Sequence, residues 1–302
     1  MDLIAAEGIE KRFGQLTALR DISLRVRRGE LYGLIGPDGA GKTTFFRILT
    51  TLMPPDGGRA TVDGLDIATD YRRIRAAVGY MPGRFSLYPD LTVKENLEFF
   101  ATLFGTRLED NYDLIRDIYV QIEPFRSRRA GRLSGGMKQK LALCCALIHR
   151  PRVLFLDEPT TGVDVVSRHE FWDMLSGLKR QGITMLVSTP YMDEAVRCDR
   201  IALIQSGRLL SIDTPQGIIE NYPDALFEVR AENMRQLTDE IRKRCSPQSC
   251  FAFGRSLHVS FSRDDVEAPQ RMRAALTAAG CTNLEIAPIT PSIEDCFIQQ
   301  MR

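Results

Sequence analysis

The sequence predicts an α/β fold, in which a mostly parallel sheet is flanked by helices and followed by a smaller α+β unit. Three observations lead to this prediction. Apolar runs as short as buried parallel strands recur along the first two thirds of the chain. A glycine-rich loop separates one of these runs from a helical pattern. From Tyr222 onward the composition shifts and the pattern becomes strand, helix, two strands, helix, strand.

The bulk composition limits the classes of function. The chain has 302 residues, which is long enough for two domains, and a net charge of +1 from 40 basic and 39 acidic residues. With this balance the protein has no net positive charge large enough to attract nucleic acid or anionic lipid. The N-terminus lacks the basic and apolar regions of a signal peptide, and no run approaches the roughly 18 apolar residues of a membrane helix. The seven cysteines follow no paired spacing, so we expect buried thiols in a reducing compartment.

The N-terminal segment, residues 2–28, predicts antiparallel strands. Ile22, Leu24 and Val26 alternate with polar residues, which is the pattern of a strand with one solvated face. Phe13 precedes the glycine-rich loop at a distance that would let its ring stack on a base. Core packing of Phe13 is an equally good interpretation of the sequence alone.

The glycine-rich loop fits the phosphate-binding pattern G-x-x-x-x-G-K-[ST]. Leu31–Ile35 predicts a buried strand before it, and an apolar helical pattern follows it, which is the context that the motif requires. The glycines let backbone N–H groups surround a phosphate at the helix N-terminus. Lys42 would reach the β- and γ-phosphates and the Thr43 hydroxyl would hold Mg²⁺. The alternative, a glycine turn with a chance lysine, does not explain the flanking elements.

The middle of the chain predicts a hairpin, another strand and a helical insertion. Residues 60–67 fit the hairpin and 78–81 the strand. Residues 84 to about 135 predict a helical subdomain inserted between strands of the sheet. Its first helix begins at a capping box, Thr92 with Glu95.

A second anion-seeking helix N-terminus follows this insertion. Leu133-Ser-Gly-Gly-Met-Lys-Gln-Lys140 places a serine and two glycines before an apolar helix. One nucleotide does not need two such sites within one chain. The pattern therefore indicates that this helix serves a nucleotide held by another subunit.

The run Val153–Glu158 predicts a strand that ends in two carboxylates. Asp157 is placed to bind Mg²⁺ through water, and Glu158 could accept a proton from an attacking water. A buried structural acid pair is the alternative, and the preceding phosphate loop favours the catalytic interpretation. Two more strands are expected at 184–189 and 201–204.

Residues 1 to about 220 resemble the ATP-binding subunit of an ABC transporter. Gly36–Thr44 is similar to the Walker A motif, Leu133–Gln139 to the signature motif, Val153–Glu158 to the Walker B motif and Thr161–Asp164 to the D-loop, while Phe13 falls at the position of the adenine-stacking aromatic residue. The resemblance implies a P-loop NTPase core of the ABC type, with an N-terminal antiparallel β part and an inserted helical subdomain. It implies two such domains dimerising head to tail, so that closure on ATP and reopening after hydrolysis drive a membrane permease.

The resemblance also implies which residues bind the nucleotide and the metal. The residues expected to bind ATP are Phe13, Gly36, Pro37, Asp38, Gly39, Ala40, Gly41, Lys42, Thr43, Thr44, Ser134, Gly135, Gly136, Gln139 and Asp164. Thr43 and Asp157 are expected to hold Mg²⁺, and Glu158 is the expected catalytic residue.

Two positions depart from the family pattern. Where the family usually has a glutamine that touches Mg²⁺ and the attacking water, this chain has Gly83. Where it usually has a histidine that contacts the γ-phosphate, this chain has Pro190, which offers neither a side-chain donor nor an N–H. Losing a positioned polar group at a reaction centre slows chemistry by roughly 10²–10⁴-fold. We therefore expect this chain's own site to bind ATP and to hydrolyse it slowly.

The intact signature would complete the second site of the dimer, so a heterodimer with one degenerate and one competent site is the favoured arrangement. A homodimer, which would lack both groups at both sites, is the alternative. Glu158 argues mildly against a wholly inactive site.

The C-terminal region, residues 221–302, predicts a ferredoxin-like α+β domain with strands near 225–230, 251–261 and 283–287. Its closing stretch, Thr290–Ile298, is similar to the tail of ATPases that serve ABC-2-type exporters. A role in packing and dimer support is favoured over regulator binding. His258 alternates with apolar residues in a strand, which favours a surface position over a ligand role.

Three functional classes remain from the sequence. The first is the ATPase subunit of an ABC exporter, peripheral on the cytoplasmic face of the membrane. The second is a regulatory subunit that binds nucleotide without turnover, which Gly83 and Pro190 favour for this chain's own site. The third is a soluble ABC protein acting on DNA or ribosomes, which normally carries two such domains or long inserted arms that this chain lacks.

Overall fold

The computed structural model describes residues 1–84 and 86–301 and divides the chain into two compact units, Met1–Pro215 and Gln216–Arg302. The boundary lies at Pro215 instead of at the expected residue 220. Ile218 explains the difference, because it is buried and its carbonyl oxygen accepts a hydrogen bond from the Cys296 thiol at 3.6 Å, within the second unit. None of the helices in the described ranges is long and apolar enough to span a bilayer.

The first unit contains a six-stranded, mostly parallel sheet in the order β10-β9-β3-β8-β7-β6. Only β10 runs antiparallel to its neighbour. The strands are β3 (Leu31–Ile35), β6 (Val78–Met81), β7 (Val153–Asp157), β8 (Thr184–Thr189), β9 (Arg200–Gln205) and β10 (Arg208–Asp213). Every residue of the central strands β3, β7 and β8 is buried, which explains why they appear in the sequence as continuous apolar runs.

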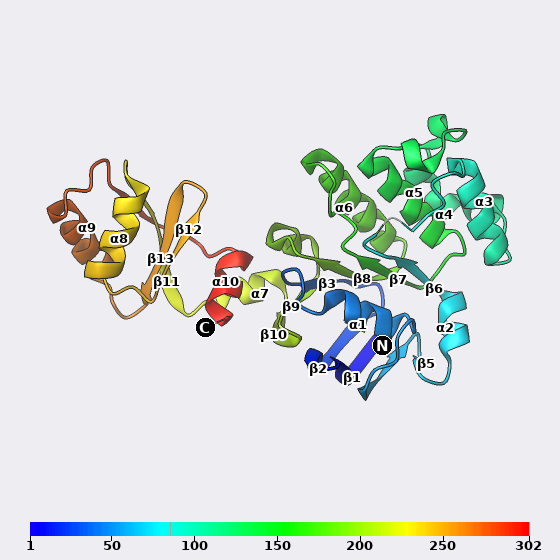
Figure 1. The fold of residues 1–302 in the computed structure, drawn as a ribbon, viewed down its shortest axis with the longest axis horizontal. Helices are drawn as coiled ribbons and strands as arrows, with labels where there is room; N and C mark the ends of the chain where they lie inside the picture. Colours follow the sequence, from blue (N-terminus) through cyan, green and yellow to red (C-terminus); the bar gives the residue numbers. More distant parts are fainter. Residues whose placement is uncertain (85, 302) are drawn as a thin grey trace. The chain divides into compact units, whose positions relative to one another are not determined.

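An antiparallel sheet in the order β2-β1-β4-β5 covers one side of the unit, as the N-terminal alternation predicts. Its strands are β1 (Asp2–Phe13), β2 (Leu16–Arg27), β4 (Gly57–Val62) and β5 (Leu65–Asp66). Helix α1 (Lys42–Leu49) packs in the core shared by the two sheets, where Phe46 meets Phe155 edge to face. Figure 1 shows α1 with the antiparallel strands on one side of the parallel sheet and α6 (Val165–Arg180) on the other.

The predicted helical insertion lies between β6 and β7. It contains α3 (Val93–Leu103) and α4 (Tyr112–Tyr119), and α5 (Gly135–Leu147) packs against both, while α2 (Tyr71–Ala77) precedes β6. The Thr92–Glu95 capping box forms at the start of α3. The described part of the unit also contains the 3₁₀ turns η1 (Leu108–Asn111), η2 (Glu123–Phe125), η3 (Ala130–Arg132) and η4 (Met192–Arg197).

The second unit has the predicted β-α-β-β-α-β order and an antiparallel sheet in the order β12-β13-β11-β14. Its elements are α7 (Pro215–Glu220), β11 (Asp224–Arg230), α8 (Met234–Arg244), β12 (Ser249–Phe253), β13 (Ser256–Ser262), α9 (Ala268–Ala278), β14 (Glu285–Pro288) and α10 (Ile293–Gln300). Helices α8 and α9 and the strands share one apolar core.

The surface position expected for His258 is wrong. Its side chain is only 15% exposed, and its Nδ1 atom lies 2.7 Å from Oδ1 of the buried Asp295. The ring also stacks on Phe253. The alternation in β13 is genuine, but α10 supplies Asp295 to the face of the strand that carries His258.

Candidate nucleotide-binding site

The loop between β3 and α1 is held by backbone contacts on both sides. The Gly36 N–H donates to the carbonyl oxygen of Thr189 at 3.2 Å, and the Gly207 N–H donates to that of Ala40 at 3.0 Å. A Cβ atom at Gly36 would lie 2.2 Å from the Ile204 carbonyl oxygen, so no larger residue fits there. Neighbouring strands therefore fix the loop before any ligand binds.

Gly41 is the N-cap of helix α1, and its φ of 104° is one that only glycine adopts without strain. A Cβ atom at Gly41 would lie 2.6 Å from the Ala18 carbonyl oxygen of β2. In the loop, Asp38 and Gly39 are exposed and Ala40 is buried. The loop thus presents its tip to solvent and its base to the protein.

Lys42 is buried beneath this loop, with 3% of its surface exposed. Its Nζ atom donates to the carbonyl oxygens of Gly36 at 2.7 Å and Pro37 at 3.0 Å. It also lies 3.1 Å from Oε1 of Glu158. A cation held this close to the loop is placed to neutralise a phosphate in the same space.

Asp157, at the end of β7, is 2% exposed. The Ser188 hydroxyl of the adjacent strand donates to its Oδ1 atom at 2.7 Å. Burial raises the pKa of the Asp157 carboxyl, and hydrogen bonds from Ser188 and Thr43 oppose that rise. Asp157 and Thr43 thus bring two oxygen donors together below the loop, which is the donor chemistry of Mg²⁺.

Glu158 has a left-handed backbone conformation with φ of 51°. Its N–H is held by the backbone oxygen of Ser188 at 3.1 Å and by the Ser188 hydroxyl at 3.0 Å. This conformation separates the side chains of two consecutive carboxylates. Asp157 points into the protein, while Glu158 faces the cleft in front of the loop.

That cleft has a volume of about 480 Å³, which lies within the usual range for a small-molecule site. It brings together several of the predicted residues. They are Phe13, Gly39, Gly41, Lys42, Thr43, Thr44 and Glu158, and Gln15, Leu16, Thr17, Ala18, Arg20, Ser206 and Gly207 complete the lining. The Phe13 ring is 45% exposed, so it is available to a planar ligand.

The residues of the second helix N-terminus lie outside this cleft: Ser134, Gly135, Gly136 and Gln139, together with Asp164. The Ser134 hydroxyl accepts the Met137 N–H at 3.4 Å and so caps α5. A Cβ atom at Gly136 would lie 2.8 Å from the Ser167 hydroxyl oxygen, and the Ser167 N–H donates to Asp164 Oδ1 at 3.0 Å. The second helix N-terminus therefore packs against the residues that contact Asp164, and it does not line the cleft of the phosphate loop.

Gly83 lies beside the two carboxylates, and Pro190 follows the residue that binds the start of the loop. A Cβ atom at Gly83 would lie 3.0 Å from the Asp157 carbonyl oxygen and 3.7 Å from the Glu158 Cβ atom. Pro190 follows Thr189, whose carbonyl oxygen binds the first N–H of the loop. Neither position presents a polar side chain to the site.

Sequence reasoning missed two supporting residues. Ser188 donates to the Asp157 carboxylate and accepts the backbone N–H of Glu158, and a polar residue within the apolar run of β8 was the available signal. Gly207 binds the loop from a turn that follows β9, and no pattern in the sequence connects it with residue 40.

The glycine loop, buried lysine and strand-end carboxylates define a P-loop nucleotide-binding protein. The sequence matches the ABC transporter family over residues 19–161. It is 37% identical to the probable multidrug ABC transporter ATP-binding protein YbhF of Escherichia coli over 98% of this chain and 51% of that protein, so this chain spans about half the length of that relative. It is 36% identical to the Nod factor export ATP-binding protein I of Burkholderia lata, over 96% and 94% of the two chains. The chain belongs to the ATP-binding proteins of the ABC transporter family, an ATPase family.

Solved structures support the same assignment. The structure of an ATP-binding subunit of an ABC transporter superposes with a TM-score of 0.66 at 27% identity, covering 73% of this chain and 93% of that one. The dimeric structure of MJ0796, a bacterial ABC transporter cassette, superposes with a TM-score of 0.63 at 25% identity, covering 70% and 98%.

Proposed function

We propose that this chain binds Mg-ATP in the cleft between Phe13 and the phosphate loop and serves as the ATP-binding subunit of an export system. The observation that carries the proposal is the position of Lys42. Its buried ammonium group is held by loop carbonyls and by Glu158 at the floor of the cleft. Charged phosphate oxygens would form stronger hydrogen bonds with this ammonium group than the neutral carbonyl oxygens do.

The residues around the loop fit a bound magnesium ion. Thr43 and Asp157 are its proposed protein ligands, and Ser188 holds the Asp157 carboxylate in place. When bound, Mg²⁺ supplies positive charge next to the phosphates of ATP. Glu158 would accept a proton from the attacking water, and its backbone, fixed by Ser188, sets where that carboxylate points.

Slow turnover at this chain's own site follows from Gly83 and Pro190. Glu158 is the one acid at the cleft that we assign to chemistry. No polar side chain at either departing position helps it to orient the water. Binding rests on Lys42, Thr43 and the loop, which are complete. We therefore propose tight binding and turnover reduced by roughly 10²–10⁴-fold.

A head-to-tail dimer gives the second helix N-terminus a role. Ser134, Gly135, Gly136, Gln139 and Asp164 lie away from this chain's own cleft, so they are free to complete a site on a partner. The MJ0796 cassette is dimeric, which supports a dimer of such units. We favour a heterodimer with a competent partner over a homodimer. The E. coli relative has room for a second region of this size.

A permease docking surface is proposed on the same unit. A mostly apolar groove of about 190 Å³ lies among β6, α3 and α5. Its lining includes Leu52, Met81, Leu87, Phe100, Phe104 and His149. Leu52 is exposed, so an apolar segment of the permease would fit against this groove. We propose that the chain acts at the cytoplasmic face of the membrane, as its resemblance to ABC exporter subunits implies.

A second candidate is a regulatory subunit that closes on ATP without turnover and pairs with a competent ATPase. Gly83 and Pro190 favour it over the leading proposal for this chain alone. Both candidates require nucleotide binding, and they differ in whether Glu158 contributes any turnover.

The test is ATP hydrolysis by the purified chain beside Glu158→Gln and Pro190→His, with ATP binding measured separately. We expect wild type to bind Mg-ATP and to turn over little faster than Glu158→Gln, and Pro190→His to gain activity. The double variant Pro190→His/Glu158→Gln is the matched control and should lose that gain. Normal turnover by wild type that depends on Glu158 would contradict the degenerate site. Absence of Mg-ATP binding would contradict the whole proposal.

A further inference from the structure

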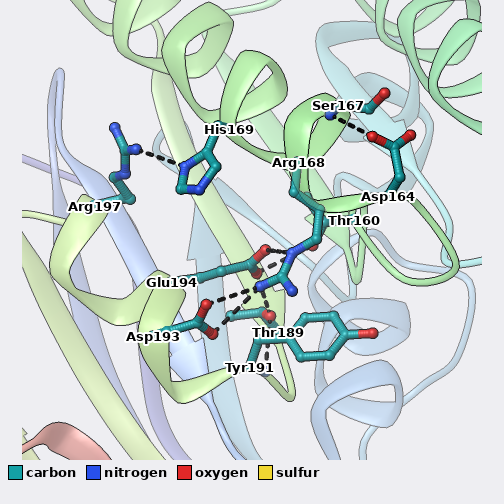
Figure 2. A network of polar contacts seen from close by, with 10 residues as sticks. All are labelled: Thr160, Asp164, Ser167, Arg168, His169, Thr189, Tyr191, Asp193, Glu194 and Arg197. Atoms are coloured by element: carbon teal, nitrogen blue, oxygen red, sulfur yellow. Dashed lines mark hydrogen bonds and ion pairs between the residues drawn. The ribbon is translucent and has the colours of Figure 1, made fainter.

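Glu194 is a buried carboxylate with a separate donor from each of three segments. Its side chain lies in η4 and is 4% exposed. Oε2 accepts from the hydroxyl groups of Thr160 at 3.1 Å and Thr189 at 2.5 Å, and Oε1 accepts from Nε of Arg168 at 3.0 Å (Figure 2). A carboxylate this deeply buried is stable only with such partners.

Arg168 is held in one orientation from both sides. Its guanidinium group also pairs with Asp193 at 3.2 Å and lies 4.1 Å from the centre of the Tyr191 ring. Figure 2 shows this group between the acidic pair and the aromatic ring. Arg168 belongs to the first turn of α6, which Asp164 caps through the Ser167 N–H. The orientation of Glu194 is therefore tied to the start of α6.

Two paths from the phosphate loop meet at Glu194. In the first, Gly36 is bonded to the Thr189 backbone, and the Thr189 hydroxyl binds Glu194. In the second, Lys42 pairs with Glu158, which lies two positions before Thr160. A phosphate in the loop competes for the Lys42 ammonium group with Glu158 and with the Gly36 carbonyl oxygen, so ligand binding changes a contact at the start of each path.

We infer that Glu194 is a positioning residue that makes the placement of Asp164 depend on whether nucleotide occupies this chain's own loop. This inference rests on the proposed nucleotide site. Thr160 and Arg168 border the segment that contains Asp164, and both are bonded to the same carboxylate. In the proposed dimer that segment faces the partner's site. A slow site would then regulate a competent one through Glu194.

A second ion pair also connects η4 with α6, but it is not part of the two paths from the phosphate loop. Arg197 of η4 pairs with Asp173 of α6 at 3.2 Å and with His169 at 3.0 Å, so it joins the same two elements. Asp173 is exposed, and none of these residues bonds to Thr160 or Thr189. Arg197→Met is therefore a matched control for Glu194→Gln.

The test is hydrogen exchange in the full chain with and without Mg-AMP-PNP, followed in peptides that cover residues 159–168. The reporting amides are those of Thr161, Val163, Ser167 and Arg168. The Thr161 N–H donates to the Glu158 carbonyl oxygen, and the other three donate to acceptors within the segment. We expect nucleotide to slow their exchange about fivefold or more in wild type and in Arg197→Met. In Glu194→Gln the slowing should fall below about twofold, while the affinity for Mg-AMP-PNP changes by less than about threefold.

Unchanged slowing in Glu194→Gln would overturn the inference, as would nucleotide binding to wild type without any slowing. If wild type does not bind Mg-AMP-PNP, the proposed function fails together with it. If Glu194→Gln does not fold, Thr160→Val removes one bond to the carboxylate and keeps the shape of the side chain. In Thr160→Val, nucleotide should no longer slow exchange at Thr161 and Val163. Slowing that persists at these two amides would also overturn the inference.

Discussion

Lys42 and Glu158 form an ion pair in which Nζ lies 3.1 Å from Oε1. The lysine is buried, whereas the carboxylate borders the cleft. The pair joins the residue proposed to bind the phosphates to the residue proposed to accept the proton. In the proposed function, phosphate binding would release Glu158 from Lys42 and leave its carboxylate available to a water molecule.

Lys42→Met should weaken ATP binding by about 10–100-fold, because each hydrogen bond to a charged group contributes about 1.5–3 kcal/mol. The substitution keeps the apolar stem and removes the charge. A fluorescent nucleotide titration measures the affinity. Lys179→Met is the control, since Lys179 pairs with Asp199 away from the cleft. Equal affinities for wild type and Lys42→Met would show that the nucleotide binds elsewhere.

Asp157→Asn should raise the thermal stability of the ligand-free protein at pH 7. Burial raises the pKa of Asp157 above its ordinary value of 3.8, so the native state binds the proton more tightly than the unfolded chain does. The protonated form therefore stabilises the fold below about pH 3.8, and this contribution is lost as the pH rises. Asparagine does not ionise, so it avoids this loss of stability, and its side-chain oxygen still accepts the hydrogen bond from the Ser188 hydroxyl.

A gain of about 1 kcal/mol would raise the Tm by roughly 2–4 °C. The difference between Asp157→Asn and wild type should shrink as the pH approaches 4, and Mg²⁺ should no longer stabilise the variant. Asp38→Asn, in the exposed part of the loop, is the control. A variant less stable than wild type at pH 7 would mean that the ionised carboxylate is well stabilised despite its burial.

Gly36→Ala and Gly39→Ala should differ sharply. The new methyl group would lie 2.2 Å from the Ile204 carbonyl oxygen at position 36, whereas at position 39 no atom of the described residues lies within 4 Å of it. Gly36→Ala should cost about 1–3 kcal/mol from overpacking and abolish ATP binding. Gly39→Ala should cost about 1–2 kcal/mol from its positive φ and largely retain binding. Chemical denaturation and nucleotide titration measure both effects, and similar losses of binding would contradict the packing argument.

Elements whose pattern is local are predicted well from this sequence. The bounds 31–35, 78–81 and 184–189 agree with β3, β6 and β8, because buried parallel strands are continuous apolar runs between polar loops. The C-terminal element order is also correct, since its turns and alternation are local signals.

Contacts between distant segments could not be predicted in this way. His258 meets Asp295 across 37 positions, and Thr160 meets Glu194 across 34. No periodicity encodes which polar residue of one element faces another. The P-loop motif identified Lys42 and Thr43, but the donors that orient Asp157 and Glu194 became evident only from the packing of β7, β8 and α6.

The backbone atoms that pack against Gly36 and Gly41 limit how the loop could be transferred to another protein. Its shape depends on carbonyl oxygens of Ala18 and Ile204 and on the N–H of Gly207, none of which belongs to the motif. Grafting residues 36–44 into another strand–helix junction would transfer the motif sequence without the surrounding contacts that fix its conformation. A working graft would have to carry the edge of β2 and the turn between β9 and β10 as well.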